Sequence, residues 1–280
     1  MDEIFRPFED DDVDDAVAAS VREGWAAGRD WLEALVEHDP EGCFAATSGG
    51  RTVARLTSTR YARTGWIGNL IVDPGHRRRG LGTRLFVHAL HRLEALGATT
   101  VRLEADAAGV SIYRRLGFVD EFESTRFLLR GPRPVPASDA TRLDASDLPD
   151  IAALDAAAFG DDRMRLLSMI HARAACAFAT REGGRISGYA LAVRTNLGAH
   201  VGPLVARHTE AAADLLSACM LTLPGMPLTI GVPGPNRGWC DLLRAIGFEQ
   251  RVSSLRMVRG APAAEGRISS IYAIGNGACG

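Results

Sequence analysis

The residues best suited to chemistry lie in the stretch VDPGHRRRGLGTRL, Val72 to Leu85, which sets three consecutive arginines among three glycines. An apolar run precedes it, and apolar residues at helical spacing follow from Leu81. A helix N-terminus exposes unpaired N–H groups at the positive end of the helix dipole, and glycines let a ligand approach them. The stretch therefore predicts an anion site at the start of a helix, with the arginines adding positive charge.

Two common phosphate-binding loops are excluded by the residues of this stretch. A Walker loop requires a lysine, and the chain contains none. A dinucleotide fingerprint, GxGxxG, requires glycine where Leu85 stands. The pattern that remains is Arg77-x-x-Gly80-x-Gly82 between an apolar strand and a helix.

This pattern follows LIVDP and precedes IYRRLGF, and in that setting it resembles the acetyl-CoA pyrophosphate loop of the GNAT superfamily of N-acetyltransferases. The resemblance implies an α/β fold with a mixed, mostly antiparallel sheet whose two central parallel strands splay apart. It also implies acetyl-CoA as cosubstrate, with no metal, and direct transfer of the acetyl group to a primary amine in a ternary complex.

The resemblance assigns cofactor-binding roles to particular residues. Backbone groups of Leu70 to Val72 would pair with the pantetheine arm, and N–H groups from Arg78 to Thr83 would cradle the pyrophosphate. Asp106 stands where many members have asparagine and would contact the cofactor arm as an acceptor only. The full predicted set is Leu70, Ile71, Val72, Arg77, Arg78, Arg79, Gly80, Leu81, Gly82, Thr83 and Asp106.

Tyr113, four residues before Gly117, matches the tyrosine that protonates the departing CoA thiolate in this family. A phenol with a pKa of about 10 can supply that proton, although Tyr113 could also be a packing aromatic. The base that takes the proton of the amine is left open. Glu104 is our first candidate and His76 a second, and an acceptor held as free amine would need no strong base.

The elements around these residues occur twice in the chain. Strands, two amphipathic helices, a Gly-Gly hairpin and a terminal Gly-Phe recur in the same order in both halves, which indicates an internal duplication. The proline-rich segment GPRPVPASDA separates the copies. We predict a catalytic domain over 1–131, a linker over 132–139, and a second GNAT-like domain with a C-terminal tail over 140–280.

The second copy is predicted to be degenerate. GPLVARHTE has no glycine turn where the first copy has RxxGxG, and Leu243 stands at the position of Tyr113. This copy would therefore neither bind CoA nor catalyse transfer. Asn236 is expected to cap a helix and Trp239 to be buried packing. The tail, GRISSIYAIGNGACG, could dock near the cleft of the first domain.

Composition limits the classes of function. The net charge is −2, which disfavours a general nucleic-acid binder, and no apolar run is long enough for a membrane span. The five scattered cysteines and the acidic N-terminus suggest a cytoplasmic protein without a signal peptide. The expected partner is a small-molecule or peptide amine, and a homodimer is left open. The alternative function is an acyl-CoA-binding sensor without turnover.

Overall fold

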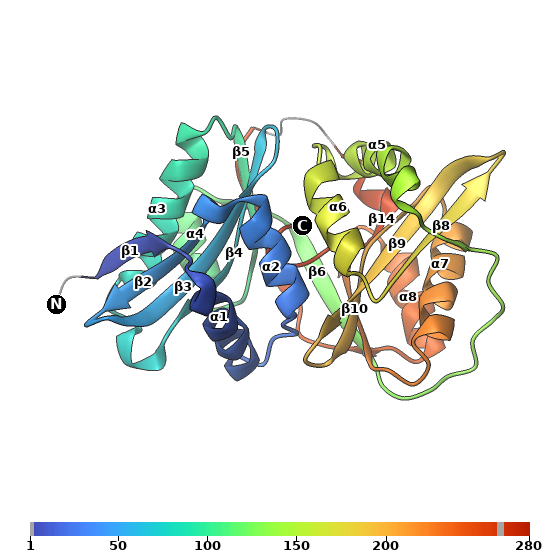
Figure 1. The fold of residues 1–280 in the computed structure, drawn as a ribbon, viewed down its shortest axis with the longest axis horizontal. Helices are drawn as coiled ribbons and strands as arrows, with labels where there is room; N and C mark the ends of the chain where they lie inside the picture. The colour runs from blue at the N-terminus through green and yellow to red at the C-terminus, as the bar shows by residue number, and fades with distance from the viewer. Residues whose placement is uncertain (1–2, 262–265) are drawn as a thin grey trace.

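The computed structural model describes residues 3–261 and 266–280, so the predicted halves 1–131 and 140–280 each include a few residues outside these ranges. The two halves lie side by side, with the N-terminus at one end and residue 280 between the halves (Figure 1). No described helix is both long and apolar enough to cross a bilayer.

Over its described residues, the first half contains six strands and four α-helices. The strands are β1 (Ile4–Pro7), β2 (Cys43–Ser48), β3 (Arg51–Arg60), β4 (Thr64–Val72), β5 (Thr100–Ala105) and β6 (Val119–Leu129). The helices are α1 (Asp10–Arg22), α2 (Arg29–His38), α3 (Leu81–Ala95) and α4 (Val110–Arg115). The acidic run before Val13 starts α1, where Glu9 and Asp12 form a capping box. Asp12 is buried against Arg6, whereas Asp10 and Asp11 are exposed.

The second half repeats this order of elements. Its strands are β7 (Thr141–Arg142), β8 (Cys176–Glu182), β9 (Arg185–Thr195), β10 (Gly198–Ala206), β11 (Leu228–Pro233), β12 (Glu249–Gln250), β13 (Ser254–Gly260) and β14 (Ile271–Ala273). Its helices are α5 (Leu148–Phe159), α6 (Met164–Arg173), α7 (Thr209–Thr222) and α8 (Arg237–Ile246).

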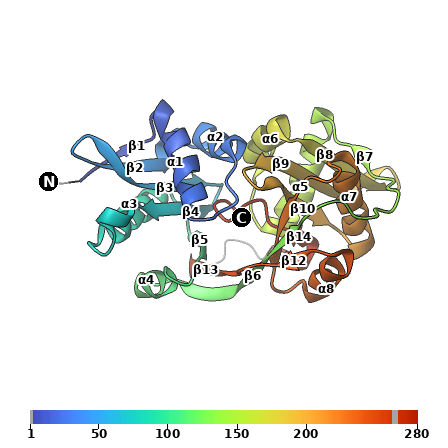
Figure 2. The ribbon, with the colours of Figure 1, turned by 90° about the horizontal axis from the view of Figure 1, so that it is seen from below.

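The two halves share one sheet because each sends its last long strand across to the other. The strand order is β1-β2-β3-β4-β5-β13-β6-β11-β10-β9-β8-β7, so β13 from the second half pairs with β5 and β6 reaches β11. Figure 2 shows β13 and β6 side by side, beneath the space between the two halves. The pairing of β13 with β5 runs from Leu255 opposite Ala105 to Gly260 opposite Thr100.

The sheet is mixed, as the resemblance implies. Two neighbouring pairs are parallel, β4 with β5 and β10 with β11, and the remaining pairs are antiparallel. Each parallel pairing is short: β4 and β5 pair only at Thr64–Trp66, and β10 and β11 only at Ala199–His200. Beyond these residues each pair of strands separates, which opens one gap in each half.

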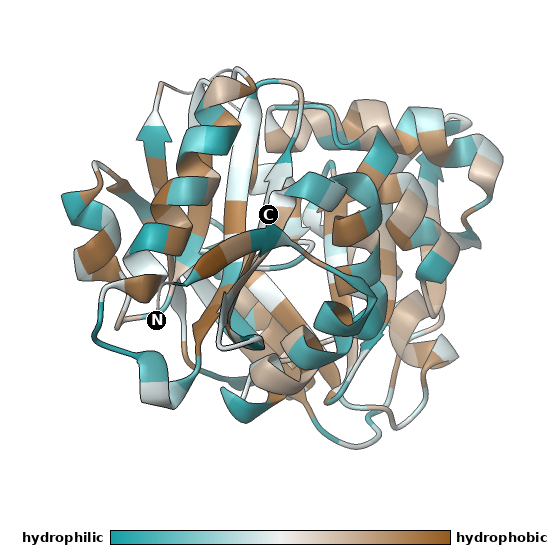
Figure 3. Cartoon of the chain, turned by 60° about the vertical axis from the view of Figure 1, so that its left-hand side comes forward, coloured by the Kyte–Doolittle hydropathy of each residue, from teal (hydrophilic) through white to brown (hydrophobic). Residues whose placement is uncertain are grey.

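Helices cover the sheet with their apolar sides, and hydrophilic and hydrophobic residues alternate along them (Figure 3). One apolar core lies under α3, and another lies under α7 and α8. A third core combines both halves, since Trp31, Tyr61 and Trp66 of the first pack with Phe159 and Leu166 of the second. The halves are therefore joined by apolar packing as well as by strand exchange.

Candidate functional site

The gap between β4 and β5 is the centre of the site in the first half. The register of β4 with β3 shifts between Arg55 and Thr57, and Asn69 in this irregular part of β4 has a positive φ of 51°. Such a bulge turns the backbone groups that follow it. Since β5 pairs no further than Trp66, the edge of Leu70–Val72 that faces the gap has no strand beside it. The bulge at Asn69 and the unpaired edge of Leu70–Val72 both leave backbone groups available to an extended ligand.

The glycine turn sits directly beyond the end of β4. Gly80 has a φ of 76°, a left-handed conformation that favours glycine, and it is the N-cap of α3. A Cβ on Gly82 would lie 3.1 Å from Cγ2 of Val72, so glycine lets the helix start close against the strand. The first bond into the helix runs from the Arg84 N–H to the Gly80 carbonyl (3.0 Å).

Six consecutive N–H groups at this turn, those of residues 78–83, have no acceptor among the described residues. They include the start of a 15-residue helix, where the dipole favours negative charge. Arg78 also has a positive φ, of 61°, so the chain curls here. The turn is thus built to receive an anion.

The arginines of the turn do not all point to the same place. Arg77 donates from Nε to the Val72 carbonyl (2.7 Å) and pairs with Glu23 of the α1–α2 connection. Arg78 and Arg79 are exposed. Arg77 therefore holds the turn to neighbouring structure, while Arg78 and Arg79 are free to meet a ligand.

Tyr113 on α4 lies across the gap from β4, the strand that precedes the glycine turn. Its ring packs against Phe86 at 4.8 Å between centroids and against Phe118 at 6.2 Å. Burial raises the pKa of Tyr113 to about 12, and the nearby charge of Asp106 acts in the same direction. Among the described residues no hydrogen bond holds its hydroxyl, so a protonated phenol is available to a ligand.

Asp106 follows β5 directly and accepts the Gly109 N–H on its carbonyl (2.8 Å). Partial burial raises the pKa of its carboxyl, while the charge of Arg126 and a hydrogen bond from the Trp25 indole act in the opposite direction. His76, the second candidate base, lies in the short helical turn Pro74–His76 before the arginines.

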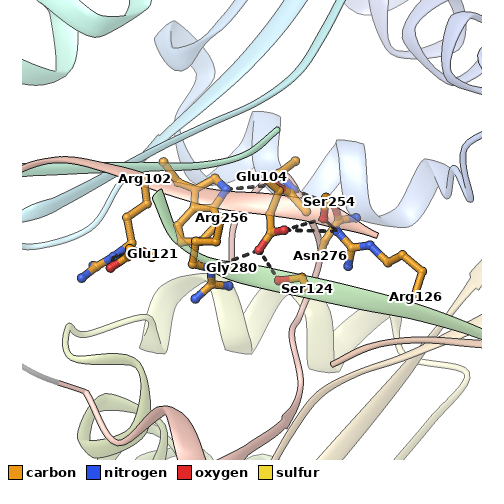
Figure 4. Close-up of polar contacts among 12 residues, drawn as sticks. Arg102, Glu104, Glu121, Ser124, Arg126, Ser254, Arg256, Asn276 and Gly280 are labelled. Atoms are coloured by element: carbon orange, nitrogen blue, oxygen red, sulfur yellow. Dashed lines mark hydrogen bonds and ion pairs between the residues drawn. The ribbon is translucent and has the colours of Figure 1, made fainter. Parts of the chain in front are cut away.

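Glu104 is buried in a network that crosses between the halves (Figure 4). Its carboxylate accepts hydrogen bonds from Arg256 Nε (3.0 Å), Ser124 Oγ (2.9 Å) and Ser254 Oγ (2.5 Å). Arg126 lies a little further away, with 3.7 Å between Nη2 and Oε2. Oε1 of Glu104 therefore accepts two hydrogen bonds and Oε2 one, and its catalytic role stays a prediction.

The tail runs past the start of the same gap. The Trp66 indole donates to the Gly277 carbonyl (3.0 Å), and the Tyr61 hydroxyl donates to the Cys279 carbonyl (2.8 Å). A Cβ on Gly68 would lie 2.4 Å from the Cα of Ala278, so the tail packs directly on β4. The tail does dock beside the gap of the first half.

The corresponding gap in the second half, between β10 and β11, differs from the gap in the first half. Strand β14 pairs with Leu204 and Val205 of β10, and the N–H of Ile274 donates to the Gly231 carbonyl of β11 (2.8 Å). The tail thus occupies the gap between β10 and β11. The following helix, α7, has His208 as its N-cap, whose imidazole accepts the Ala211 N–H, instead of a glycine turn.

Two expectations for α8 have different outcomes. Trp239 is buried, as expected. Asn236 stands at the N-cap but makes no side-chain cap; its amide donates to the Ile271 carbonyl (2.5 Å). The capping expectation is wrong because the tail supplies a nearer acceptor for this amide.

The structure brings most of the predicted residues around one gap: Leu70–Val72 on one side, the glycine turn beyond its end, and Tyr113 and Asp106 across it. Sequence reasoning missed the residues that the second half and the tail add, chiefly Arg256, Ser254 and Gly277. The alternating segment SLRMVRG could have identified β13 as a strand, but nothing in it indicates pairing with β5.

Comparisons with known proteins agree with this architecture. Residues 4–118 match the acetyltransferase (GNAT) family, and residues 151–273 match an acetyltransferase (GNAT) domain. The uncharacterized N-acetyltransferase YitH of Bacillus subtilis is 29% identical over 194 residues, 68% of each chain. Holothin acyltransferase from a Pseudoalteromonas species is 24% identical, over 86% of this chain and 82% of its own.

Solved structures show the same fold over nearly the whole chain. A candidate acetyltransferase from Pyrococcus horikoshii superposes with a TM-score of 0.82 at 27% identity, over 99% of this chain and 96% of its own. A tandem GNAT protein from the clavulanic acid biosynthesis pathway superposes with a TM-score of 0.63 at 19% identity, over 94% and 99%.

Proposed function

The chain belongs to the GNAT family of acetyltransferases and carries two GNAT domains in tandem, and from this premise we propose that its first half transfers an acetyl group from acetyl-CoA to a primary amine. One observation carries the proposal: an open cradle of N–H groups at residues 78–83 and a protonated Tyr113 border the same gap between β4 and β5.

The residues at the turn fit the pyrophosphate of acetyl-CoA. Six N–H groups are available to phosphate oxygens, Gly80 supplies the left-handed turn, and a side chain at position 82 would fill space against β4. The free edge of Leu70–Val72 suits the amide groups of a pantetheine arm, which hydrogen bond as a strand does. Bound acetyl-CoA would supply a thioester carbonyl at the gap.

We propose direct transfer in a ternary complex. The amine nitrogen attacks the thioester carbonyl, a C–N bond forms and the C–S bond breaks. Tyr113 then gives its proton to the departing thiolate, and the extra proton on nitrogen leaves to a base or to water. Backbone N–H groups of β4 would polarise the carbonyl, and the site would hold both reactants at reacting distance.

Glu104 remains our candidate for the proton of the amine. Arg256 and Ser124 donate to Oε1 and Ser254 donates to Oε2, so a proton from the amine would have to reach the remaining lone pair of Oε2. A free amine that loses its proton to water would need no such path. A comparison of Glu104→Gln with wild type, at a pH where the amine is largely unprotonated and again at neutral pH, separates these two routes.

The second half, we propose, is a structural partner that does not bind acetyl-CoA. Its gap contains β14, and its α7 starts with a histidine cap instead of a glycine turn. Leu243, at the position of Tyr113, is buried and cannot donate a proton.

The function is tested by the release of CoA thiol from acetyl-CoA in the presence of a panel of small-molecule and peptide amines. Turnover with at least one amine is expected, and Tyr113→Phe should reduce kcat by about 100-fold or more with little change in acetyl-CoA binding. Tight binding without turnover for every amine would instead favour an acyl-CoA sensor.

A further inference from the structure

The connection between α1 and α2, residues 23–28, covers one end of the gap in the first half. At its start, Glu23 pairs with Arg77 of the glycine turn, which follows β4. Two residues later, Trp25 lies near enough to Asp106, which follows β5, to oppose the rise that burial causes in the pKa of that carboxyl. This connection, here called the α1–α2 loop, therefore lies beside the structure that follows both strands bordering the gap, and it contacts the glycine turn through Glu23.

The far end of the α1–α2 loop is held by the second half. The Ala27 N–H donates to Oδ1 of Asn196 (2.8 Å), and the Asn196 N–H donates to the Ala27 carbonyl (2.8 Å). Asn196 lies in the two-residue turn between β9 and β10, so both bonds connect the halves. Together they satisfy both backbone groups of Ala27, which is buried.

Close packing accompanies these bonds. A Cβ on Gly28 would lie 2.4 Å from the carbonyl oxygen of Arg194, so only glycine fits where the loop meets β9. Helix α2 begins at the next residue and packs against α6 of the second half. The loop is thus fastened at one end to the glycine turn and at the other to the hairpin of the second half.

We propose that Asn196 is a positioning residue for the transfer reaction: it fixes the α1–α2 loop over the gap and so sets the amine-binding side of the site. The inference rests on the proposed function, because it concerns the acceptor of the same reaction. Its physical basis is that Asn196 supplies the only described partner of the Ala27 N–H, while Glu23 and Trp25 can still make their contacts without it.

The test compares Asn196→Ala with Asn196→Asp, which keeps the oxygen that accepts the Ala27 N–H. Leu197→Ala is the matched control, because Leu197 occupies the other position of the same turn and is partly exposed. Two readouts are needed: amide hydrogen exchange of residues 23–28, and kcat and KM for the best amine with acetyl-CoA saturating.

We expect Asn196→Ala to speed exchange in the α1–α2 loop and to lower kcat/KM for the amine by about tenfold, the scale expected for lost positioning. Acetyl-CoA affinity should change less than threefold. Asn196→Asp and Leu197→Ala should behave like wild type. A purely structural role would lower thermal stability without lowering kcat/KM for the amine more than the affinity for acetyl-CoA.

The proposal is overturned if exchange in the α1–α2 loop is the same in Asn196→Ala and wild type, or if faster exchange leaves the amine kinetics unchanged. If wild type turns over with no amine, the proposed function fails separately, and the assignment of Asn196 to the reaction fails with it. The exchange data would then still report whether Asn196 holds the loop.

Discussion

The carboxylate of Glu104 on β5, in the first half, accepts a 3.0 Å hydrogen bond from Nε of Arg256 on β13, in the second. Both side chains are buried, and the Arg256 guanidinium also lies 4.8 Å from the Trp66 ring centroid and 4.9 Å from that of Phe122. Burial lowers the pKa of Arg256, and the charge of Glu104 opposes that effect. Strand β13 of the second half therefore places the positive charge of Arg256 beside the buried Glu104 carboxylate of the first half.

Arg256→Met should destabilise the whole chain. It would leave the buried Glu104 carboxylate with only the more distant Arg126 as a cation, at 3.7 Å, and breaking a buried ion pair costs at most about 3–5 kcal/mol. Urea unfolding measures the loss. The double variant Glu104→Gln/Arg256→Met removes both charges and should recover part of it. Equal stability of the single and double variants would contradict this account.

Gly82→Ala should weaken acetyl-CoA binding. A methyl group at this position would lie 3.1 Å from Cγ2 of Val72, so the Val72 side chain or the start of α3 must give by a few tenths of an ångström, and any shift of α3 would move its N–H groups. Weakening of one hydrogen bond to a charged group, at most about 1.5–3 kcal/mol, predicts a KM for acetyl-CoA raised by at most about 10- to 100-fold. Gly75→Ala is the control, since a Cβ there meets no atom within 4 Å. The same KM in both variants would refute the role of the turn.

One chain should bind one acetyl-CoA, because β14 fills the gap of the second half. Isothermal titration calorimetry measures the stoichiometry. Gly80→Val should abolish binding altogether, since a β-branched residue is strongly disfavoured at a φ of 76°. Two equivalents bound by wild type would show that the second half also binds the ligand, and binding by the first half that persists in Gly80→Val would contradict the role of the turn.

Local chemistry made much of the fold predictable from sequence. The glycine turn, the acidic start of α1 and the repeated Gly-Gly hairpins are set by neighbours in the chain, and each element forms where its residues indicate. Two tandem GNAT domains and the GNAT family are confirmed by the matches over residues 4–118 and 151–273.

Contacts between the halves could not be predicted in this way. Arg256 meets Glu104 only because β13 crosses into the other half, and a strand sequence does not specify which edge it joins. Asn236 was expected to cap its own helix, but it binds a carbonyl of the tail 35 residues later. The residues that such long-range packing adds to the site are therefore the ones that sequence reasoning missed.

Tyr113 should stay protonated across the working range of the enzyme. Burial raises its pKa to about 12, so the phenol keeps its proton at a pH where a free tyrosine, with a pKa of about 10, would lose half of it. We expect kcat to show no fall from phenol ionisation up to about pH 10. A pH profile with a saturating amine tests this. A fall centred below pH 10 that disappears in Tyr113→Phe would contradict it.

His200 should make the chain less stable in mild acid. Its Nε2 donates to the Ile274 carbonyl (3.1 Å), and burial lowers its pKa to about 4, so the folded chain keeps it neutral. The unfolded chain takes up a proton below about pH 6.5, so the free energy of unfolding falls between about pH 6.5 and 4, by at most about 3 kcal/mol. Urea unfolding across this range should show a flatter curve for His200→Gln than for wild type. His91→Gln, at an exposed position, should leave the slope unchanged, and equal slopes for all three proteins would refute the assignment.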